Sequence, residues 1–372
     1  MTPALPAADV AIVGCGIVGL AAAERLTAHG LSVVAVDGAG IAGGATGASG
    51  GLVRALDLSG RLGGWAAESL DLYLRRGRRG SWPAVREHGS LTLVDAAGLP
   101  GATAAAAAVR AGGQSADVLT AEEIGARFPG LSLPEGFAGV YEARAGWLPA
   151  REVATAMRRD AGPGLRLLTA RATGVLTSGS RVAGIATTSG PVPARAVLLA
   201  AGVGSTALAG SVGVQLPLIT RAVGYCLFEL AEPDGVSGPA GPAGPRGPAG
   251  LPTVIDSTTG AWLRRWGPGA TVLAGVVSPA TGIPATVRAR VAATEEHRVR
   301  EVVRHRYPRL AHASLVGGVS AYDAMTVGGA GSVTAWPAPR GLVTATGWNG
   351  GGFKLAPAVG ARAAARIQEV LA

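Results

Sequence analysis

The chain contains little cysteine and little histidine. Its 372 residues include two cysteines, Cys15 and Cys226, which are too few for a disulfide framework or for a zinc site with four cysteine ligands. The five histidines show no metal-ligand spacing to a second histidine, cysteine or acid in a recognisable motif. We therefore expect no metal site and no disulfide-stabilised scaffold.

Long hydrophobic runs are also missing. No stretch of about 18 residues is free of polar residues, charged residues and glycine, so we expect no transmembrane helix. Met1–Ala8 lacks the basic start of a signal peptide. Hydrophobic residues still make up 48% of the chain, which at this length is enough for the cores of two domains. We expect a globular, cytoplasmic protein without a membrane partner.

Charged residues amount to 15% of the chain, but the two signs are unequal. The 33 Lys+Arg against 24 Asp+Glu give a formal net charge of +9, which raises the possibility of a nucleic-acid or other acidic partner. The one dense basic run, 74–79, has no interleaved aromatic residue and lies in no recognised nucleic-acid motif. We interpret it as the exposed end of a helix and expect no nucleic-acid partner.

What the chain does contain, close to its start, is a strand, a glycine turn, a helix and a second strand. The apolar run Val10–Val13 leads directly into GCGIVG, and a second strand, Leu31–Val36, ends at Asp37. In dinucleotide-binding folds the glycines permit a tight turn, admit a pyrophosphate and let the helix pack on the strand, while the acid binds the ribose. We therefore predict a dinucleotide site at Gly14, Gly16, Ile17, Val18, Gly19 and Asp37.

Two further segments are expected beside this site. The loop Gly38–Gly51 consists largely of glycine and alanine with Thr46 and Ser49, and it leads into Leu52-Val53-Arg54. Such a loop can lie flat against a ligand with its amides exposed. The apolar run Val197–Ala201, which ends at Gly202, predicts another central strand of the nucleotide domain.

The remaining patterns predict a mixture of helices and strands. Thr120 and Glu123 have the spacing of a capping box at the start of a short helix. An amphipathic helix is expected over Val287–Tyr307, and a terminal helix ends at about Leu371. Further helices are expected over 66–74, 102–111 and 146–159, and strands over 89–94, 165–169, 174–177, 181–187, 221–230, 253–266 and 342–345.

A glycine/proline-rich loop is expected at 235–252. Glycine recurs at every third position from Gly235 to Gly250, often followed by proline, but six triplets are too few to hold a collagen triple helix. We interpret the segment as an extended, polyproline-like surface loop, with a lid over the substrate as the alternative.

Lysine is the rarest charged residue, because Lys354 is the one lysine in the chain. An ammonium is a compact point charge and a guanidinium is a wide planar fork, so a retained lysine favours a tight site. It lies in GWNGGGFKLAP, after a predicted strand and at the start of the terminal helix. Three glycines and a helix N-terminus form a nest of amides suited to an anionic group.

Seven segments together resemble the FAD-dependent D-amino acid oxidase family, and within it the sarcosine-oxidase-like (glycine/sarcosine oxidase) branch. They are GCGIVG with Asp37, GATGASGGLVR, GWLPAREVATAM, VLLAAG, GAWLRRWGPGATVLAG, AYDAMT and GWNGGGFKLAPAVG, in family order. The resemblance implies an α/β fold, with a Rossmann-type FAD-binding domain and a second α+β substrate domain built on an antiparallel sheet. The first would comprise residues 1–80, 146–215 and 318–372, and the second residues 81–145 and 216–317.

The same resemblance assigns site residues. Arg54 and Lys354 match the two cations that hold the substrate carboxylate in that branch, and two cations give a carboxylate orientation as well as charge. Trp262, Trp348 and Tyr322 are candidate pocket walls, although each could equally be a core residue. Contacts to FAD are expected from Gly14, Gly16, Ile17, Val18, Gly19, Asp37, Ala45, Thr46, Ser49, Gly50, Gly51, Leu52, Ala172, Thr173, Ala201, Gly202, Gly347, Asn349, Gly350, Gly351, Gly352, Phe353 and Lys354.

Three family features are missing from the sequence. The oxygen-activating lysine expected within Val272–Ala274 is absent, and so is the flavin-tethering cysteine expected around Ser320–Tyr322. A family histidine near Val276 is replaced by apolar residues. We therefore expect FAD to bind without a covalent bond and to react slowly with oxygen.

The resemblance implies removal of a hydride from the carbon next to the amine of a small amino acid (secondary, cyclic or D) to give an imine. Two alternatives stay open at this point: a 2-hydroxy acid dehydrogenase with a non-oxygen acceptor, and a dinucleotide-binding regulator. The sequence also leaves open whether the electron acceptor is oxygen or another compound, and what the oligomeric state is.

Overall fold

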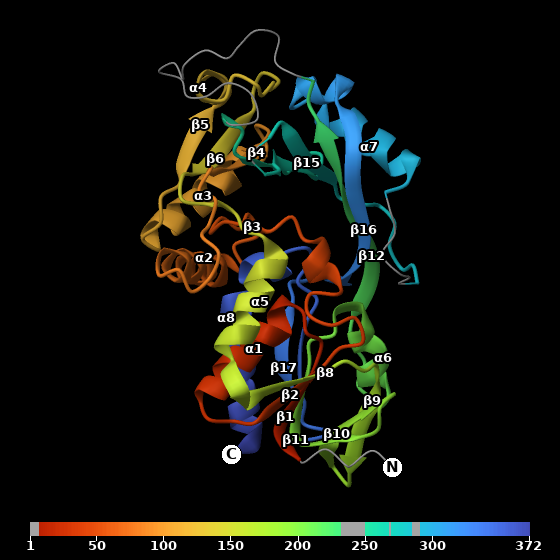
Figure 1. Cartoon of the computed structure of the whole chain (residues 1–372). Coiled ribbons are helices and arrows are strands. Elements are labelled where there is room, and N and C mark those ends of the chain that lie inside the picture. Colours follow the sequence, from red (N-terminus) through yellow and green to blue (C-terminus); the bar gives the residue numbers. More distant parts are fainter. Residues whose placement is uncertain (1–6, 232–249, 268, 285–290) are drawn as a thin grey trace.

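The computed structural model describes residues 7–231, 250–267, 269–284 and 291–372, and all structural statements refer to these residues. They form two stacked parts (Figure 1), a lower one around a largely parallel sheet and an upper one around a largely antiparallel sheet. The predicted α/β fold class is confirmed.

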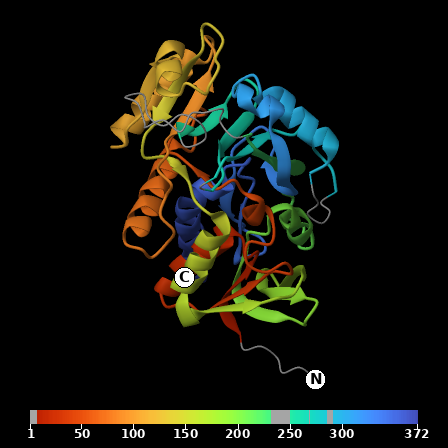
Figure 2. The ribbon, with the colours of Figure 1, turned by 45° about the horizontal axis from the view of Figure 1, so that its top comes forward.

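Helices lie in both the lower and the upper part of the molecule (Figure 1, Figure 2). They are α1 (Ile17–Ala28), α2 (Gly63–Arg78), α3 (Leu99–Ala111), α4 (Ala121–Arg127), α5 (Ala150–Asp160), α6 (Ser205–Gly210), α7 (Ala293–Val303) and α8 (Gly352–Leu371), with the short helical turns η1 (Ala45–Ala48), η2 (Gly162–Gly164), η3 (Gly202–Gly204) and η5 (Pro308–His312).

The strands belong to two large sheets and one two-stranded ribbon. They are β1 (Ala8–Val13), β2 (Val33–Val36), β3 (Leu52–Val53), β4 (Ser90–Val94), β5 (Asp117–Thr120), β6 (Ala138–Glu142), β7 (Gly146–Trp147), β8 (Leu165–Leu168), β9 (Ala172–Ser178), β10 (Arg181–Thr187), β11 (Val192–Leu199), β12 (Leu218–Glu229), β13 (Thr253–Asp256), β14 (Ala261–Arg265), β15 (Thr271–Val276), β16 (Ser314–Thr326), β17 (Ser332–Ala335) and β18 (Leu342–Thr346).

The lower sheet has the strand order β17-β18-β11-β1-β2-β8, and the strands from β18 to β8 run parallel. In β1, Val10 and Ile12 are fully buried in the core formed with α1, α5 and α8, while Ala11 and Val13 pack on the opposite face against the β9–β10 hairpin. Both faces are therefore covered, which is why this strand is apolar from Val10 to Val13.

Helices α1 and α8 pack directly on each other. A Cβ atom added at Gly360 of α8 would lie 2.5 Å from Ala21 Cβ and 2.8 Å from Ala22 N in α1, so the two backbones touch without an intervening side chain. Because α1 follows β1 and α8 follows β18, both helices start at the carboxyl edge of the same parallel sheet. The close contact thus fixes two helix N-termini at one edge.

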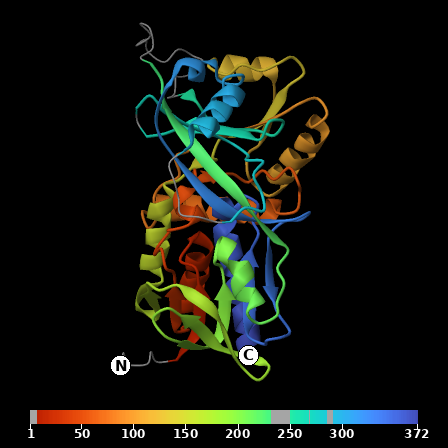
Figure 3. The same ribbon diagram turned by 90° about the vertical axis from the view of Figure 1, so that its right-hand side faces the viewer.

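The upper sheet has the order β16-β12-β15-β14-β13-β4-β6-β5. Helix α7 covers one face, where Phe228 and Val254 are fully buried. On the other face Leu273 and Tyr225 pack with Ala48 of η1, so this face is turned toward the glycine-rich loop of the lower part. Figure 3 shows the long strands β12 and β16 running from the upper sheet down to the lower part.

The residue boundaries of the two predicted domains stay a prediction. The expected boundary between residues 317 and 318 falls inside β16, which pairs with β12 from Leu218↔Thr326 to Glu229↔Ser314. Because this pair of strands spans both parts, strand pairing alone gives no single boundary between the two domains.

Several predicted elements differ in extent. The stretch 253–266 is two strands, β13 and β14, joined by a turn in which Asp256 accepts hydrogen bonds from Thr258 N and Thr258 Oγ1. Strand β12 pairs with β15 and β16. Apolar alternation cannot reveal such a tight turn, because the alternation resumes immediately on the other side.

Helix α7 begins at Ala293 and ends at Val303, so it is shorter than the predicted Val287–Tyr307. Residue 287 lies outside the described residues, and so does the glycine/proline-rich loop of 235–252 except for its last three positions. The predicted capping box is confirmed, since Thr120 Oγ1 accepts from Glu123 N and the Glu123 side chain accepts from Thr120 N. The basic run closes α2, but Arg76 within it binds Glu24 at 2.6 Å, so the run is not wholly exposed.

Among the described residues, no helix is both long and apolar enough to cross a membrane.

Candidate active site

The first glycine turn brings the start of α1 close to the end of β11. Gly14 has φ +108°, and a Cβ there would lie 2.4 Å from Ala200 O. A Cβ at Gly19 would lie 2.1 Å from Gly14 O, so the helix packs on the turn without a side chain between them. Ala201 and Gly202, predicted from the second apolar run, therefore lie beside the turn. Both glycines are needed for geometry that a larger residue would block.

Two polar side chains hold this turn in place. Asp37 accepts hydrogen bonds from Cys15 N and Ala39 N, each at 2.8 Å. Thr46 Oγ1 accepts from Ile17 N at 2.9 Å, which ties the glycine-rich loop to the first turn of α1. The predicted segments 14–19, 37 and 45–52 thus meet at one place.

The N-cap residues of the two helices at this edge are glycines, Gly16 for α1 and Gly351 for α8, and they provide no side-chain cap. Neither helix has an acidic residue in its first turn, and in α1 the amide of Ile17 is bound by Thr46 Oγ1 of the glycine-rich loop. Helix N-termini present free N–H groups and a partial positive charge. Both ends are therefore suited to anionic or carbonyl groups of a ligand.

The second glycine motif is locked to β16. Asn349, at φ +51°, accepts from Thr326 N at 2.7 Å and donates to Gly329 O at 2.8 Å. Asp323 accepts from Gly350 N at 3.0 Å. Gly347 has φ +83°, and a Cβ there would collide with Thr326 Oγ1. Strand β16 of the upper sheet thereby sets the path of the chain into α8.

Arg54 and Lys354 lie together although 300 positions separate them in the sequence. Burial, then the positive charge of Arg54, lowers the pKa of Lys354 to about 7. Burial also lowers the pKa of Arg54. Lys354 Nζ donates to Leu56 O at 3.4 Å, and Arg54 Nε is buried without a hydrogen-bond partner among the described residues. No described acid lies within ion-pair distance of either side chain, so two neighbouring cations keep free donors.

Two acids near these cations were not predicted from the sequence. Glu142, 2% exposed at the end of β6, accepts from Ala55 N at 2.7 Å and Leu56 N at 3.1 Å through Oε1. Asp57 is half-buried and accepts from Leu62 N and Ser59 Oγ. Both interact electrostatically with Arg54 and Lys354. One sequence signal could have pointed to Glu142: it is an acid at the end of the otherwise apolar strand AGVYE, and acids are rarely buried in strands.

Residues of the upper sheet contact the segment that leads to Arg54. Arg264 Nε donates to Gly50 O at 2.8 Å, and a Cβ at Gly50 would lie 2.7 Å from the Trp262 ring. The Arg264 guanidinium stacks 3.9 Å from the centroid of Trp147, and burial lowers its pKa to about 9. Three residues of the upper sheet, Trp262, Arg264 and Glu142, therefore contact residues 50–56 and fix their position.

These contacts belong to a row of polar residues that crosses four strands. Thr253, Ser90 and Glu142 are direct partners in register on β13, β4 and β6, and Arg264 on β14 follows Leu263, the partner of Val254; each of the four polar residues is at most 2% exposed. Directly opposed side chains lie on the same face of a sheet. Thr253 Oγ1, Ser90 Oγ and Glu142 Oε2 have no hydrogen-bond partner among the described residues. The face over residues 50–56 is thus polar as well as buried, unlike the face under α7.

The other candidate residues are placed differently. Tyr322 pairs with Ala222, and its neighbour Ala321 packs with Ala48, so Tyr322 projects from the opposite face of its strand. The structure does not bring Tyr322 and Trp262 to one face. Trp348 is 8% exposed, 6.1 Å from the Trp65 ring, in the main core. Arg171, just before Ala172 and Thr173, lies beside Gly38, so the start of β9 is near the end of β2.

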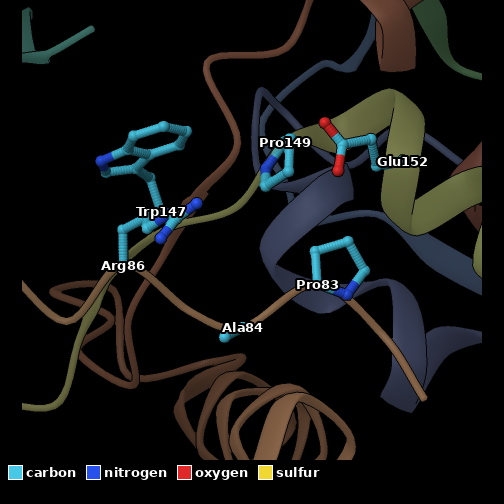
Figure 4. A pocket seen from close by; sticks show the side chains of 6 residues that line it. All are labelled: Pro83, Ala84, Arg86, Trp147, Pro149 and Glu152. Atoms are coloured by element: carbon cyan, nitrogen blue, oxygen red, sulfur yellow. The ribbon is translucent and has the colours of Figure 1, made fainter. Parts of the chain in front are cut away.

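A pocket of about 270 Å³ lies outside this set of residues (Figure 4). Its lining residues are Pro83, Ala84, Arg86, Trp147, Pro149 and Glu152. It includes Trp147, the ring on which Arg264 stacks, but none of the predicted site residues. We assign no ligand to it.

Comparison with known proteins now identifies the family. The family model described as "DAO: FAD dependent oxidoreductase" matches residues 9–366. The chain belongs to this family. Its predicted membership, its class as an FAD-dependent oxidoreductase and its cofactor, FAD, are thereby confirmed, and a dinucleotide-binding regulator is no longer required to explain the glycine motifs.

Three solved structures illustrate the shared fold. L-proline dehydrogenase from P. horikoshii is 19% identical with a TM-score of 0.85, and the match covers 98% of this chain and 94% of that one. Glycine oxidase from Geobacillus kaustophilus is 22% identical with a TM-score of 0.81 and coverage of 97% and 95%. Iminodiacetate oxidase from Chelativorans sp. BNC1 is 20% identical with a TM-score of 0.78 and the same coverage. No curated protein matches the chain in sequence.

The residues present fit FAD. The uncapped start of α1 offers free amides for the pyrophosphate, and Asp37 closes the turn where the ribose of a dinucleotide is bound in such folds. A Cβ at Gly44 or Gly350 would meet no atom within 4 Å, which leaves open space beside the glycine-rich loop and the final glycine motif. The uncapped start of α8 supplies a second set of donors.

Proposed function

We propose that this oxidoreductase removes a hydride from the carbon next to the amine of a small amino acid, either secondary, cyclic or of D configuration, to give an imine. The observation that supports the proposal most is the Arg54–Lys354 pair. Two neighbouring, partly buried cations that have no ion-pair partner among the described residues are costly unless an anion joins them. A substrate carboxylate is such an anion.

The residues of the chain have separate tasks in this proposal. Arg54 and Lys354 bind and orient the carboxylate through charge-assisted hydrogen bonds. Glu142, Arg264 and Lys354 hold residues 50–56 through bonds to backbone groups, so that Arg54 keeps its position. The indole of Trp262 covers Gly50 and limits the entry of water. FAD, when bound, supplies the hydride acceptor.

The comparisons support the same chemistry at the level of substrate class. The three similar structures carry the names proline dehydrogenase, glycine oxidase and iminodiacetate oxidase, and each name denotes a small carboxylated amine. We therefore extend small carboxylated amines to this chain as its proposed substrates. Rates of flavin reoxidation by oxygen and by an artificial dye distinguish the possible electron acceptors.

The experiment mixes the FAD-loaded enzyme, without oxygen, with each member of a panel of amino acids and 2-hydroxy acids. Reduction of the flavin is measured as the loss of its visible absorbance. Rapid bleaching by proline, N-methylglycine or a D-amino acid is expected. Bleaching by hydroxy acids alone would favour the 2-hydroxy acid dehydrogenase instead.

Arg54→Ala and Lys354→Ala should each raise the apparent substrate dissociation constant by at least about tenfold, since a hydrogen bond to a charged group contributes about 1.5–3 kcal/mol. Arg362→Ala, which removes a surface arginine paired with Glu68, is the matched control and should leave binding unchanged. Unaltered substrate binding in both site variants would contradict the proposed function.

A further inference from the structure

The first turn of α8, which carries Lys354, lacks one of its own hydrogen bonds. In a regular helix the N–H of residue 357 would donate to the carbonyl of Phe353, but residue 357 is Pro357, which has no N–H. The proline ring also crowds the carbonyl four residues before it. Phe353 is 5% exposed, so water has little access to this carbonyl. The Phe353 carbonyl therefore needs a partner from outside the helix.

Tyr73 of α2 is this partner. Its Oη donates to Phe353 O at 2.7 Å, although 280 positions separate the two residues. The Tyr73 side chain is fully buried, and its ring stacks on the Phe353 ring with centroids 5.6 Å apart and 17° between the planes. Burial raises the pKa of Tyr73 well above its ordinary value, so the hydroxyl stays protonated and remains a donor.

This hydrogen bond falls on the peptide group that joins Phe353 to Lys354. The Phe353 carbonyl and the Lys354 N–H belong to one planar unit, so a bond to the carbonyl sets the orientation of the whole plane. Lys354 lies in the first turn of α8, where N–H groups have no partner within the helix. At the other end of its side chain, Lys354 Nζ donates to Leu56 O at 3.4 Å. Tyr73 therefore fixes the backbone of Lys354, and Leu56 binds its ammonium.

We propose that Tyr73 is a positioning residue for Lys354: its hydroxyl replaces the helix hydrogen bond that Pro357 removes, and so keeps the ammonium beside Arg54 in the carboxylate site. This rests on the proposed function. Without the hydroxyl, the Phe353 carbonyl is buried without a partner, which costs more free energy than the bond itself contributes. The peptide group then turns toward another donor or toward water, and Lys354 moves with it. Tyr73 acts on the substrate only through Lys354.

Ser69 provides a matched control within the same pair of helices. It lies one turn before Tyr73 in α2, is also fully buried, and its Oγ accepts from Ala358 N of α8 at 3.2 Å. Ala358 lies one turn after Lys354, on the far side of Pro357. Loss of the Ser69 bond should thus weaken the packing of α2 on α8 without acting on the peptide group of Lys354.

The first test compares Tyr73→Phe, which removes the hydroxyl and keeps the ring, with Ser69→Ala. With FAD bound and at pH 6, below the pKa of about 7 of Lys354, propionate is titrated as a carboxylate ligand and followed by the change in flavin absorbance. Tyr73→Phe should bind propionate at least about fivefold more weakly, and Ser69→Ala should stay within about twofold of the parent, although urea unfolding should show both variants to be less stable. Unchanged binding in Tyr73→Phe, or equal weakening in both variants, would overturn the proposal.

The second test restores the missing helix bond. Pro357→Ala supplies an N–H that can donate to the Phe353 carbonyl, so the Tyr73 hydroxyl is no longer required. In the Pro357→Ala background, Tyr73→Phe should therefore change the affinity for propionate by less than about twofold. An effect as large as in the parent would show that Tyr73 does not replace the bond removed by Pro357.

The third test separates positioning from general stability. A residue that acts through Lys354 has nothing left to position in Lys354→Ala, so adding Tyr73→Phe should cause no further loss of propionate binding. Losses that multiply in the double variant would indicate a purely structural role and refute the inference. If Arg54→Ala and Lys354→Ala weaken binding but Tyr73→Phe does not, the proposed function stands and the inference about Tyr73 is wrong. If Arg54→Ala and Lys354→Ala leave binding unaltered, the proposed function itself fails, and the inference fails with it.

Discussion

At the scale of single residues, the site is marked by two neighbouring cations, Arg54 and Lys354, that have no ion-pair partner among the described residues. Lys354 donates to the Leu56 carbonyl and lies beside Arg54, in a space bounded by α8 and the segment after β3. A compact ammonium suits such a position better than a wide guanidinium. The retention of lysine at this one position, in a chain otherwise supplied with arginine, has a geometric explanation.

The first prediction tests this explanation with Lys354→Arg. Charge is kept, but the planar fork cannot take the position of the ammonium, so propionate should bind at least about tenfold more weakly at pH 6. The parent should lose affinity as the pH rises through about 7, because Lys354 loses its proton, whereas the variant should not, because the guanidinium stays charged. Titration at pH 6 and pH 8.5 measures both effects. An unchanged affinity at pH 6 would mean that charge alone matters.

A second prediction concerns oxygen, whose reduction is accelerated by a nearby cation. Leu273, within the segment where the family lysine is expected, is fully buried and pairs directly with Arg264. Leu273→Lys should raise the rate of reoxidation by oxygen. The like charge of Arg264 opposes protonation of the new lysine, so Leu273→Lys with Arg264→Met should show a larger increase.

Stopped-flow reoxidation in air-saturated buffer, beside turnover with an artificial dye, measures this rate. The parent should turn over faster with the dye than with oxygen, and Arg264→Met alone is the control for loss of the Gly50 contact. A parent that is reoxidised by oxygen as fast as substrate reduces it would show that the missing lysine is not needed.

At the scale of elements, the contact between α1 and α8 brings the N-termini of the two helices to one edge of the sheet. Gly360 permits this contact because its missing side chain leaves room for the backbone of Ala21 and Ala22. The close approach is a property of the pair and is not visible in either helix alone. In the proposed function, FAD binding and substrate binding would both depend on this contact, since α1 would bind the phosphates and α8 carries Lys354.

The third prediction is that Gly360→Ala destabilises the fold by about 1–3 kcal/mol, because overpacking moves well-packed backbones apart. It should also weaken FAD binding. Gly101→Ala in α3 is the matched control, since a Cβ there meets no atom within 4 Å and alanine favours helix. Urea unfolding and FAD titration of both variants measure the difference. Equal stability of the two variants would refute the packing argument.

At the scale of the whole molecule, the chain crosses repeatedly between the two parts to build one site. Residues 14–54 come from the lower part, Glu142 and Arg264 from the upper sheet, and Lys354 from the last helix. The β12–β16 pair connects the two parts, and Asp323 and Asn349 link β16 to the final glycine motif. A ligand bound at this place would lie beside segments from distant parts of the chain.

The fourth prediction is that FAD binds without a covalent bond and stabilises the whole molecule. Cys15 and Cys226 are both buried, and Cys226 packs in the core under α7. Acid precipitation should leave all flavin colour in the supernatant, and excess FAD should raise the melting temperature of the apoprotein by mass action. Colour retained in the pellet would indicate a covalent bond through another residue.

The sequence alone determined the nucleotide part of this protein. The glycine turn at residues 14–19, the acid at Asp37, the capping box at Thr120 and the final glycine motif are short-range patterns, in which each residue is required by the local backbone path or by a neighbouring amide. Local rules of this kind need no knowledge of distant residues. For the same reason Arg54 and Lys354, which each follow a glycine motif, are recognisable as candidates from their neighbours in the chain.

The tertiary structure decided what surrounds those two cations. Glu142 and Arg264 stand out in the sequence only as charged residues within buried strands, and what they contact follows from the register of β14, β13, β4 and β6 and from hydrogen bonds to residues 50–56. The turn that divides 253–266 and the late start of α7 were likewise invisible to periodicity. Burial, pairing and charge balance depend on segments far apart in sequence, and only folding brings those segments together.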